Sequence, residues 1–349
     1  MILPLVHEDL APVWSKVATE IRARYYARST RGGEMERLLA KTAPLAKAAP
    51  TRRAFEDAVN AMIAEFGDSH FELFTDEDQG YYLMDGLVLH DKAATMPQVG
   101  AWFRRAPDGY TVQMVLDGGA AERAGLRVGD LVTRVDGKPF SPVSGLKDDV
   151  GKTATLVFLR EGKPQEVRVD VTRTTALRMF LDATVASRRT VARDGKRIVV
   201  LHLWTQAATE FERALNDALA LAKQADGFVL DLRGGFGGYV GGFDSALAKG
   251  YTGPLALVVD HGSRSAKEIL SFETQRAGRA EIVGERTAGA VLGANPIRLN
   301  AWAYLEVPVV EVPSDGVRLE GRGVVPDVPV PPDKDSVERA VELLTARKV

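Results

Sequence analysis

The stretch "PLALVVDHGSRSAKEILSFETQ", Pro254 to Gln275, indicates the architecture of the larger part of the chain. An apolar run leads into a short polar turn, and a helical pattern follows whose apolar side carries Ile269, Leu270 and Phe272. The predicted order is therefore strand, sharp turn and helix, with Ser265 where the helix begins. A serine at this position is either an N-cap that accepts a backbone hydrogen bond or a nucleophile directed out of the turn.

The same alternation of strand and helix patterns continues around this stretch. The strand patterns "RIVVLHL" (197–203) and "GFVLDLR" (227–233) enclose a helical pattern over residues 207–225. Such alternation predicts an α/β core with much parallel sheet. We expect the later segment "AWAYLEVPVVEVP" (301–313) to add antiparallel strands at the edge of that core.

The earlier part of the chain has two other patterns. Residues from about 8 to 66 are helical in periodicity, and the last helix is predicted to start after Thr51 and to end at Gly67. Residues from about 92 to 174 read as short strands and turns, with a small helix at 120–123. These patterns predict a helical subdomain followed by a small β-rich domain.

The β-rich region contains "AGLRVGDLVTRVDG" (124–137), which resembles a PDZ domain of the bacterial permuted type. Such modules bind an extended peptide by adding it as a strand, and they often capture its terminal carboxylate on backbone N–H groups. The resemblance implies that the peptide-binding loop is Val99-Gly100-Ala101-Trp102.

Composition excludes several classes of function. The formal net charge of −2 gives no electrostatic reason to expect nucleic acid or an anionic membrane as a partner. The chain has no cysteine, which excludes disulfides, thiolate metal sites and cysteine nucleophiles. No group of His, Asp and Glu has metal-ligand spacing, and neither "GLKDDVGKT" nor "GGFGGYVGG" fits a nucleotide-binding motif, so no metal or cofactor is expected.

The cellular location stays open at this point. No apolar run approaches the roughly 20 residues of a membrane span, so we expect no stable membrane insertion. The start "MILPLVHEDLAP" does not predict a signal peptide. We expect a cell-envelope or secreted protein if a leader was removed, and a cytoplasmic one otherwise. The oligomeric state is not indicated.

A glycine-rich segment, "DLRGGFGGYVGG" (231–242), follows one of the predicted strands. Its glycines supply either a flexible turn with positive φ or a close approach of the backbone to a ligand. We expect Asp231 and Arg233 to stabilise this loop rather than to contact substrate.

Together with "GSRSAKEI" (262–269), this segment resembles the C-terminal-processing (tail-specific) proteases and the tricorn protease core, a family of serine peptidases. In that family a "DLRxNxGG" strand end precedes a "SxSAxEI" nucleophile helix, and a PDZ module is commonly inserted before both. The resemblance covers nearly the whole chain, including "EGRGVVPDVPV" (320–330). It implies a multi-domain α/β protein with a ClpP/crotonase-like core, an N-terminal helical subdomain and an inserted PDZ-like domain. The expected divisions are residues 1–90, 91–175 and 176–349.

The resemblance also implies a site. Ser265 is the nucleophile, and the N–H groups of Ala266 and of Gly237 or Gly238 form the oxyanion hole. Many tail-specific proteases use a lysine in a segment like "GEPTFGK", but this chain reads "GERTAGA" (284–290), with an alanine in that place. Lys267 lies two residues along the helix from Ser265 and is expected to point away from it.

Histidine is the alternative base, and the chain has five. His70 follows Ser69 in "FGDSHFELF" (66–74), which resembles the serine–histidine pair of the tricorn-like branch with its Ser-His-Ser-Glu tetrad. Glu320 matches the glutamate that completes the tetrad. His202 lies in a strand and is expected to be structural, and His261 is too close to Ser265 along the chain to act as its base.

These residues predict a serine endopeptidase that cleaves unfolded or flexible polypeptides without ATP, metal or another cofactor. Two alternatives remain. One is a catalytically inactive scaffold of the same fold that binds a peptide or another ligand. The other is an enzyme that hydrolyses a small ester or amide.

Overall fold

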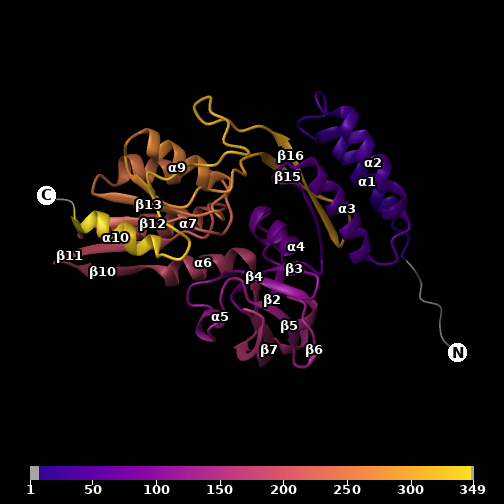
Figure 1. The fold of residues 1–349 in the computed structure, drawn as a ribbon, viewed down its shortest axis with the longest axis horizontal. Helices are drawn as coiled ribbons and strands as arrows, with labels where there is room; N and C mark the ends of the chain where they lie inside the picture. The colour runs from indigo at the N-terminus through magenta and orange to yellow at the C-terminus, as the bar shows by residue number, and fades with distance from the viewer. Residues whose placement is uncertain (1–7, 347–349) are drawn as a thin grey trace.

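The computed structural model describes residues 8–346, and its largest unit is a six-stranded sheet in the order β10-β11-β12-β13-β14-β17 (Figure 1). The edge strand β10 is antiparallel to β11, whereas the remaining neighbours are parallel. The strands are β10 (Arg189–Arg193), β11 (Lys196–His202), β12 (Gly227–Asp231), β13 (Leu255–Val259), β14 (Glu281–Gly284) and β17 (Val328–Pro329). The α/β architecture predicted for this region is confirmed.

Helices cover both faces of this sheet. Leu230 and Leu257 belong to a core shared with α6 (Ala176–Ser187), α7 (Thr209–Ala222) and α9 (Ala266–Arg276). Side chains of the opposite face, Val229 and Val258 among them, pack against α10 (Ser336–Ala346). Since both faces are covered, β12 and β13 are buried at every residue, which explains their continuous apolar sequence.

Three helices near the N-terminus form a second unit: α1 (Ala11–Arg24), α2 (Gly32–Lys47) and α3 (Arg52–Phe66). The predicted limits of α3 are confirmed. The Thr51 side chain accepts a hydrogen bond from the Ala54 N–H, and Gly67 ends the helix with φ 70°.

A separate sheet packs against these helices, and it changes one prediction. β1 (Glu72–Thr75) pairs with β16 (Ala303–Val310), which pairs with β15 (Gly293–Arg298). The expectation that residues 301–313 extend the edge of the core sheet is wrong. β16 carries apolar side chains that the helices cover, Leu305 and Val307 among them, and this burial decides where the strand lies.

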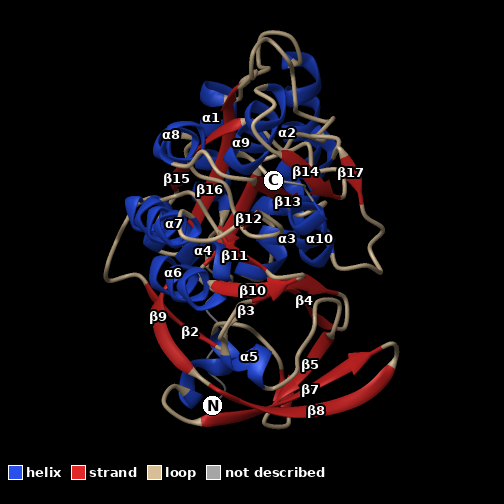
Figure 2. Cartoon of the chain, turned by 90° about the vertical axis from the view of Figure 1, so that its left-hand side faces the viewer, coloured by secondary structure: helices blue, strands red, loops and turns tan. Residues whose placement is uncertain are grey.

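The third unit is a small β-sheet in the order β3-β4-β5-β7-β8, with β6 paired to β5. Its elements are β3 (Ala101–Ala106), β4 (Gly109–Val115), α5 (Ala120–Arg123), β5 (Leu131–Val135), β6 (Lys138–Pro139), the 3₁₀ turn Ser144–Asp149, β7 (Thr153–Arg160) and β8 (Lys163–Asp170). A two-stranded ribbon of β2 (Thr95–Gln98) and β9 (Thr172–Thr175) joins this sheet to the rest of the chain. Figure 1 places it below and between the other two units, and Figure 2 shows the same arrangement after a quarter turn.

Short helical segments complete the chain: α4 (Gln79–Leu83) with the π turn Met84–Val88, and α8 (Gly241–Ser245) with the π turn Ala246–Gly250. Within residues 8–346, every helix is too short or too polar to cross a membrane. The first seven residues, which carry most of the segment inspected for a leader, lie outside the described part.

Candidate active site

Ser265 lies in the sharp turn between β13 and α9, as predicted. Its backbone has φ 60° and ψ −129°, a conformation that residues other than glycine rarely adopt. The surrounding structure holds it there, because its N–H donates to the Ala290 carbonyl at 2.8 Å and to the Glu268 carboxylate at 3.2 Å. Such local strain is common at functional sites, where it fixes a reactive side chain.

Glu268 ties the Ser265 turn to the loop before β15. Its buried carboxylate also accepts hydrogen bonds from the Thr287 hydroxyl at 2.6 Å, the Gly289 N–H at 2.7 Å and the Ala290 N–H at 2.8 Å. Burial raises the pKa of this carboxyl, and the hydrogen bonds oppose the rise. Sequence analysis did not single out Glu268, although a glutamate three residues after an N-cap serine is the signal of a capping box.

Ser69, His70 and Glu320 lie together, although 251 positions separate Ser69 from Glu320. The Glu320 carboxylate accepts from the Ser69 N–H at 3.1 Å and from the Ser69 hydroxyl at 2.9 Å. The same hydroxyl oxygen lies 2.9 Å from Nδ1 of His70. We refer to these three residues as the relay.

The relay fixes the position of the imidazole proton. A serine hydroxyl has one proton, and Ser69 donates it to the Glu320 carboxylate. Its oxygen is therefore the acceptor toward His70, so Nδ1 of that ring carries a proton and donates. Nε2 is left with a free lone pair, which is the arrangement a general base needs.

One peptide group connects the relay to the Ser265 turn. The carbonyl of Ala290 accepts from the Ser265 N–H, and the N–H of the next residue, Val291, donates to Glu320 at 2.6 Å. These two groups belong to the same amide plane, so the nucleophile turn and the relay share a rigid link. Among residues 8–346, no hydrogen bond joins the His70 ring to Ser265 itself; such contacts often tighten only when substrate is bound.

Electrostatics keep His70 neutral. Burial, together with the positive charge of Arg264, lowers the pKa of the ring to about 3, and burial is the larger cause. Arg264 directly precedes Ser265 and also interacts with Glu72 and Glu306, which are paired across β1 and β16. Sequence analysis did not assign a role to Arg264. Its effect on His70 cannot be predicted from its position next to Ser265, because only the fold brings the two side chains close.

The glycine-rich loop packs directly against Ser265. A Cβ atom added at Gly237 would lie 2.3 Å from Cβ and 2.6 Å from Oγ of Ser265, and 2.8 Å from the Ala266 nitrogen. At Gly238, which has φ 143°, an added Cβ would lie 2.3 Å from the backbone of Gln206. Only glycine fits at either position. Both glycines are therefore explained by the close approach of the backbone to its neighbours.

Neighbouring elements hold nearly every peptide group of this loop. The contacts are Arg233 O with His202 Nε2 (2.9 Å), Gly234 N with Asp260 Oδ1 (2.9 Å), Gly234 O with Lys267 Nζ (2.8 Å), Gly235 N with Met114 Sδ (3.2 Å), Phe236 N with Trp204 O (2.9 Å), and Gly237 O with Gln206 N (2.9 Å) and Thr205 Oγ1 (2.8 Å). The loop is therefore preorganised rather than flexible.

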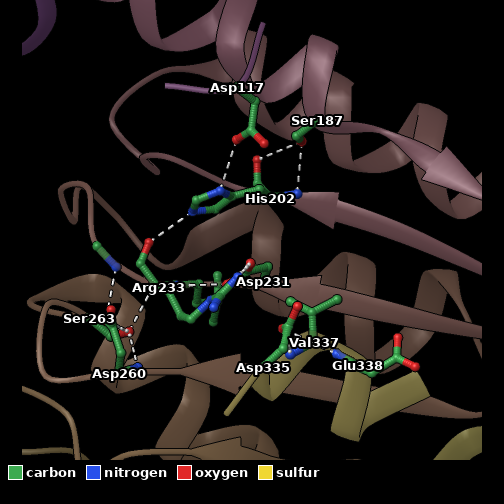
Figure 3. Close-up of polar contacts among 12 residues, drawn as sticks. Asp117, Ser187, His202, Asp231, Arg233, Asp260, Ser263, Asp335, Val337 and Glu338 are labelled. Atoms are coloured by element: carbon green, nitrogen blue, oxygen red, sulfur yellow. Dashed lines mark hydrogen bonds and ion pairs between the residues drawn. The ribbon is translucent and has the colours of Figure 1, made fainter. Parts of the chain in front are cut away.

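Charged side chains stabilise the start of the loop. Arg233 forms a bidentate ion pair with Asp231, with N–O distances of 2.7 to 3.1 Å (Figure 3). Lys267 is fully buried, and its ammonium contacts Gly234; within residues 8–346 it makes no hydrogen bond to Ser265. Burial lowers the pKa of Lys267 to about 7, while Asp231 and Asp260 oppose that shift. These contacts agree with the expected roles of Asp231, Arg233 and Lys267.

The loop assigned to peptide binding in the PDZ-like region is closed. Gly100, Ala101 and Trp102 are buried, and the Gly100 N–H donates to the Gln98 side chain. The amide of Gln79 occupies the edge of β3, donating to the Ala101 carbonyl at 3.0 Å and accepting from the Phe103 N–H at 2.9 Å. A peptide strand can add at this edge only after Gln79 leaves, so peptide binding by these residues stays a prediction.

Among residues 8–346, no group of three or more His, Cys, Asp or Glu side chains could hold a metal ion.

Two family models match parts of this chain, and several proteases are similar to it in sequence. Residues 241–330 match the model of peptidase family S41, and residues 97–171 match the model of the PDZ domain. A putative tricorn protease homolog 2 from Streptomyces coelicolor is 26% identical over 93% of this chain and 31% of its own length. A carboxyl-terminal-processing protease from Picosynechococcus is 28% identical over 80% of this chain and 74% of its own length.

Solved structures show the same fold. The photosystem II D1 C-terminal processing protease has a TM-score of 0.60 at 20% identity, covering 97% of this chain and 98% of its own. The tricorn protease has a TM-score of 0.57 at 17% identity, covering 99% of this chain and 37% of its own. Residues 241–330 of the chain are therefore similar to peptidase family S41, and residues 97–171 are similar to the PDZ domain. The predicted resemblance of the chain to the C-terminal-processing and tricorn proteases of peptidase family S41 is confirmed.

Proposed function

We propose that this chain is a serine endopeptidase that hydrolyses peptide bonds of unfolded or flexible polypeptides through an acyl-enzyme. The observation that carries the proposal is the relay of Glu320, Ser69 and His70, joined to the Ser265 turn by a single peptide group. A scaffold that only binds peptides has no use for a base held in this tautomer.

In the proposed reaction, Ser265 Oγ attacks the scissile carbonyl carbon while Nε2 of His70 takes the hydroxyl proton. The imidazolium then gives that proton to the leaving amine as the C–N bond breaks, and the acyl-enzyme remains. Water next attacks the ester with the same base, and Ser265 regains its proton. Ser69 and Glu320 orient the ring and stabilise its charged form.

We assign the oxyanion hole to the N–H groups of Ala266 and of Gly237 or Gly238. The support for this assignment is the packing of Gly237 against both Ser265 and the Ala266 nitrogen. Charge on the substrate oxygen develops only in the tetrahedral intermediate, so donors held there stabilise the transition state more than the ground state.

The finer architecture is part of the proposal. We assign a ClpP/crotonase-like core to residues 176–349, a PDZ-like domain to 91–175 and a helical subdomain carrying Ser69 and His70 to 1–90. The sheet of β1, β15 and β16 qualifies these boundaries, because it joins the first segment to residues 293–310. The helical subdomain is therefore completed by residues from the C-terminal segment.

The test of the function uses three substrates with the purified chain: an unfolded casein-like protein, a stably folded protein and a small activated ester. An endopeptidase for flexible chains is expected to degrade the first and leave the second intact. Turnover of the ester alone would favour hydrolysis of small molecules. Measurable peptide binding without turnover, and without labelling by a serine-directed phosphonate, would favour the scaffold.

The pH dependence of the reaction follows from the environment of His70. Catalysis needs the neutral ring, and the pKa of His70 is lowered to about 3, so activity is present above that pH and is lost as the pH falls through it. Between pH 8 and pH 5, kcat/KM on a short peptide is expected to show no loss from this group. An acid limb near pH 6.5, the ordinary value for histidine, would contradict the assigned environment.

Substitution of Arg264 sharpens this test. Arg264→Gln removes a positive charge that disfavours the imidazolium, so the acid limb is expected to move to higher pH. Arg264→Lys keeps the charge and is expected to leave the limb in place. Equal pH profiles for the two variants would show that the charge of Arg264 does not act on His70.

A further inference from the structure

His202, at the end of β11, lies between the PDZ domain and the glycine-rich loop. Its Nδ1 is 3.0 Å from the Asp117 carboxylate, and its Nε2 is 2.9 Å from the Arg233 carbonyl oxygen (Figure 3). Asp117 follows β4 of the PDZ domain, and Arg233 begins the loop that reaches Ser265. The imidazole therefore bridges two parts of the chain on which catalysis is expected to depend.

The bridge requires a doubly protonated ring. A carboxylate and a carbonyl oxygen only accept hydrogen bonds, so both nitrogens of His202 must donate. The charged groups facing the ring are Asp117, Asp231 and Arg233. Although burial alone would raise the pKa of Asp231, the positive charges of His202 and Arg233 lower it to about 2.

Further contacts hold the Asp117 and His202 side chains in place. Asp117 accepts a second hydrogen bond, from the Trp204 indole N–H at 2.9 Å, and the His202 ring lies against that indole with centroids 3.9 Å apart. Two further PDZ residues contact the loop itself: Met114 accepts from the Gly235 N–H, and Trp102 packs edge-on against Phe236. The loop therefore rests on the PDZ domain at two consecutive residues, Gly235 and Phe236.

The other side of the bridge leads to the nucleophile within a few residues. From Arg233 the loop runs to Gly237, whose backbone packs against Ser265 and the Ala266 nitrogen. A change in the direction of the Arg233 carbonyl turns the peptide plane it shares with Gly234, and so displaces the hydrogen bonds that hold Gly234 in place. Small displacements of a donor in an oxyanion hole have large effects on rate.

We propose that His202, as an imidazolium hydrogen-bonded to Asp117 and to the Arg233 carbonyl, is a positioning residue. It couples the position of the PDZ domain to the conformation of the glycine-rich loop. This inference rests on the proposed peptidase function. His202 does not contact the reacting atoms; it acts through the backbone of Arg233 and the loop.

The test compares His202→Gln and Asp117→Asn with the parent. His202→Gln keeps one donor and loses the charge, and kcat is expected to fall about 10- to 100-fold with KM little changed, because the ring orients the loop but does not bind substrate. His261→Gln is the matched control, since His261 is 83% exposed, and its activity is expected to equal that of the parent. Thermal unfolding of each variant verifies that it folds.

The split between kcat and KM distinguishes positioning from a merely structural role. Asp117→Asn replaces the carboxylate that accepts from Nδ1 of His202, and it is expected to lower kcat in the same direction as His202→Gln, again with KM little changed. Full kcat in a folded His202→Gln variant would overturn the inference.

A measurement without substrate separates this inference from the proposed function. ¹⁵N NMR of the histidine side chains is expected to find both nitrogens of His202 protonated at neutral pH in the folded parent. Hydrogen exchange at the amides of residues 234–237 is expected to accelerate in His202→Gln. If the parent is inert yet both results hold, the peptidase proposal fails and the coupling stands. A singly protonated ring or unchanged exchange overturns the coupling.

Discussion

Ser265→Ala and His70→Ala are each expected to lower kcat/KM for an unfolded substrate by about 10⁴- to 10⁶-fold. The first removes the atom proposed to form the acyl-enzyme, and the second removes the proposed general base. Because both act on one proton transfer, the double variant is expected to be no worse than either single variant. Rates are measured by the release of new amino termini, together with labelling by a fluorophosphonate.

Two controls accompany these variants. Ser144→Ala replaces an exposed serine in the PDZ domain, and its rate is expected to match the parent. Glu320→Gln keeps the size of the side chain but removes the charge that accepts from Ser69, so a smaller loss is expected than for His70→Ala. Retained proteolysis in a folded Ser265→Ala variant would exclude it as nucleophile, and retained proteolysis in His70→Ala would exclude it as base.

Gly237→Ala is expected to lower kcat by about 10²- to 10³-fold, comparable to the loss of one oxyanion-hole donor. The added methyl group would lie 2.3 Å from Cβ of Ser265, which is too close for either backbone to stay in place. The loop must move away, and its N–H groups move with it. Steady-state kinetics on a short peptide measure the effect, and labelling by the fluorophosphonate is expected to slow in parallel.

Gly250→Ala is the matched control for this substitution. An added Cβ at Gly250 meets no atom within 4 Å, and the residue does not have the positive φ that disfavours alanine. Both variants are expected to fold, as judged by thermal unfolding. If Gly237→Ala turned over substrate as fast as Gly250→Ala, the loop would not be the oxyanion hole.

Local patterns in the sequence predict the nucleophile turn well. The apolar run before Asp260, the helical pattern after Ser265 and the glycines after Asp231 each involve neighbours along the chain, and local sequence determines such features. Thr51 and Gly67 likewise mark the two ends of α3. The association of Ser69, His70 and Glu320 is different, because it came from resemblance to a family and not from any pattern in the residues themselves.

Local sequence patterns do not predict how segments that are distant along the chain pack together. The alternation in residues 303–310 predicts a strand, but only contact with the N-terminal helices decides which sheet that strand joins. The closure of the β3 edge by Gln79 and the bridge through His202 depend on side chains that meet across more than 20 positions. The lowered pKa of His70 also depends on packing, because burial and Arg264, a cation far away along the chain, cause it.

The wide separation of the relay residues along the chain has a consequence for biosynthesis. A ribosome that has made Ser69 and His70 must add 195 more residues before Ser265 exists and 250 more before Glu320 exists. β1 likewise lacks its partner β16 until that stage. A nascent chain shorter than 320 residues thus lacks part of the proposed hydrolytic machinery. The proposed activity, which is directed at unfolded segments, therefore arises only after the first 320 residues of the molecule itself have been made.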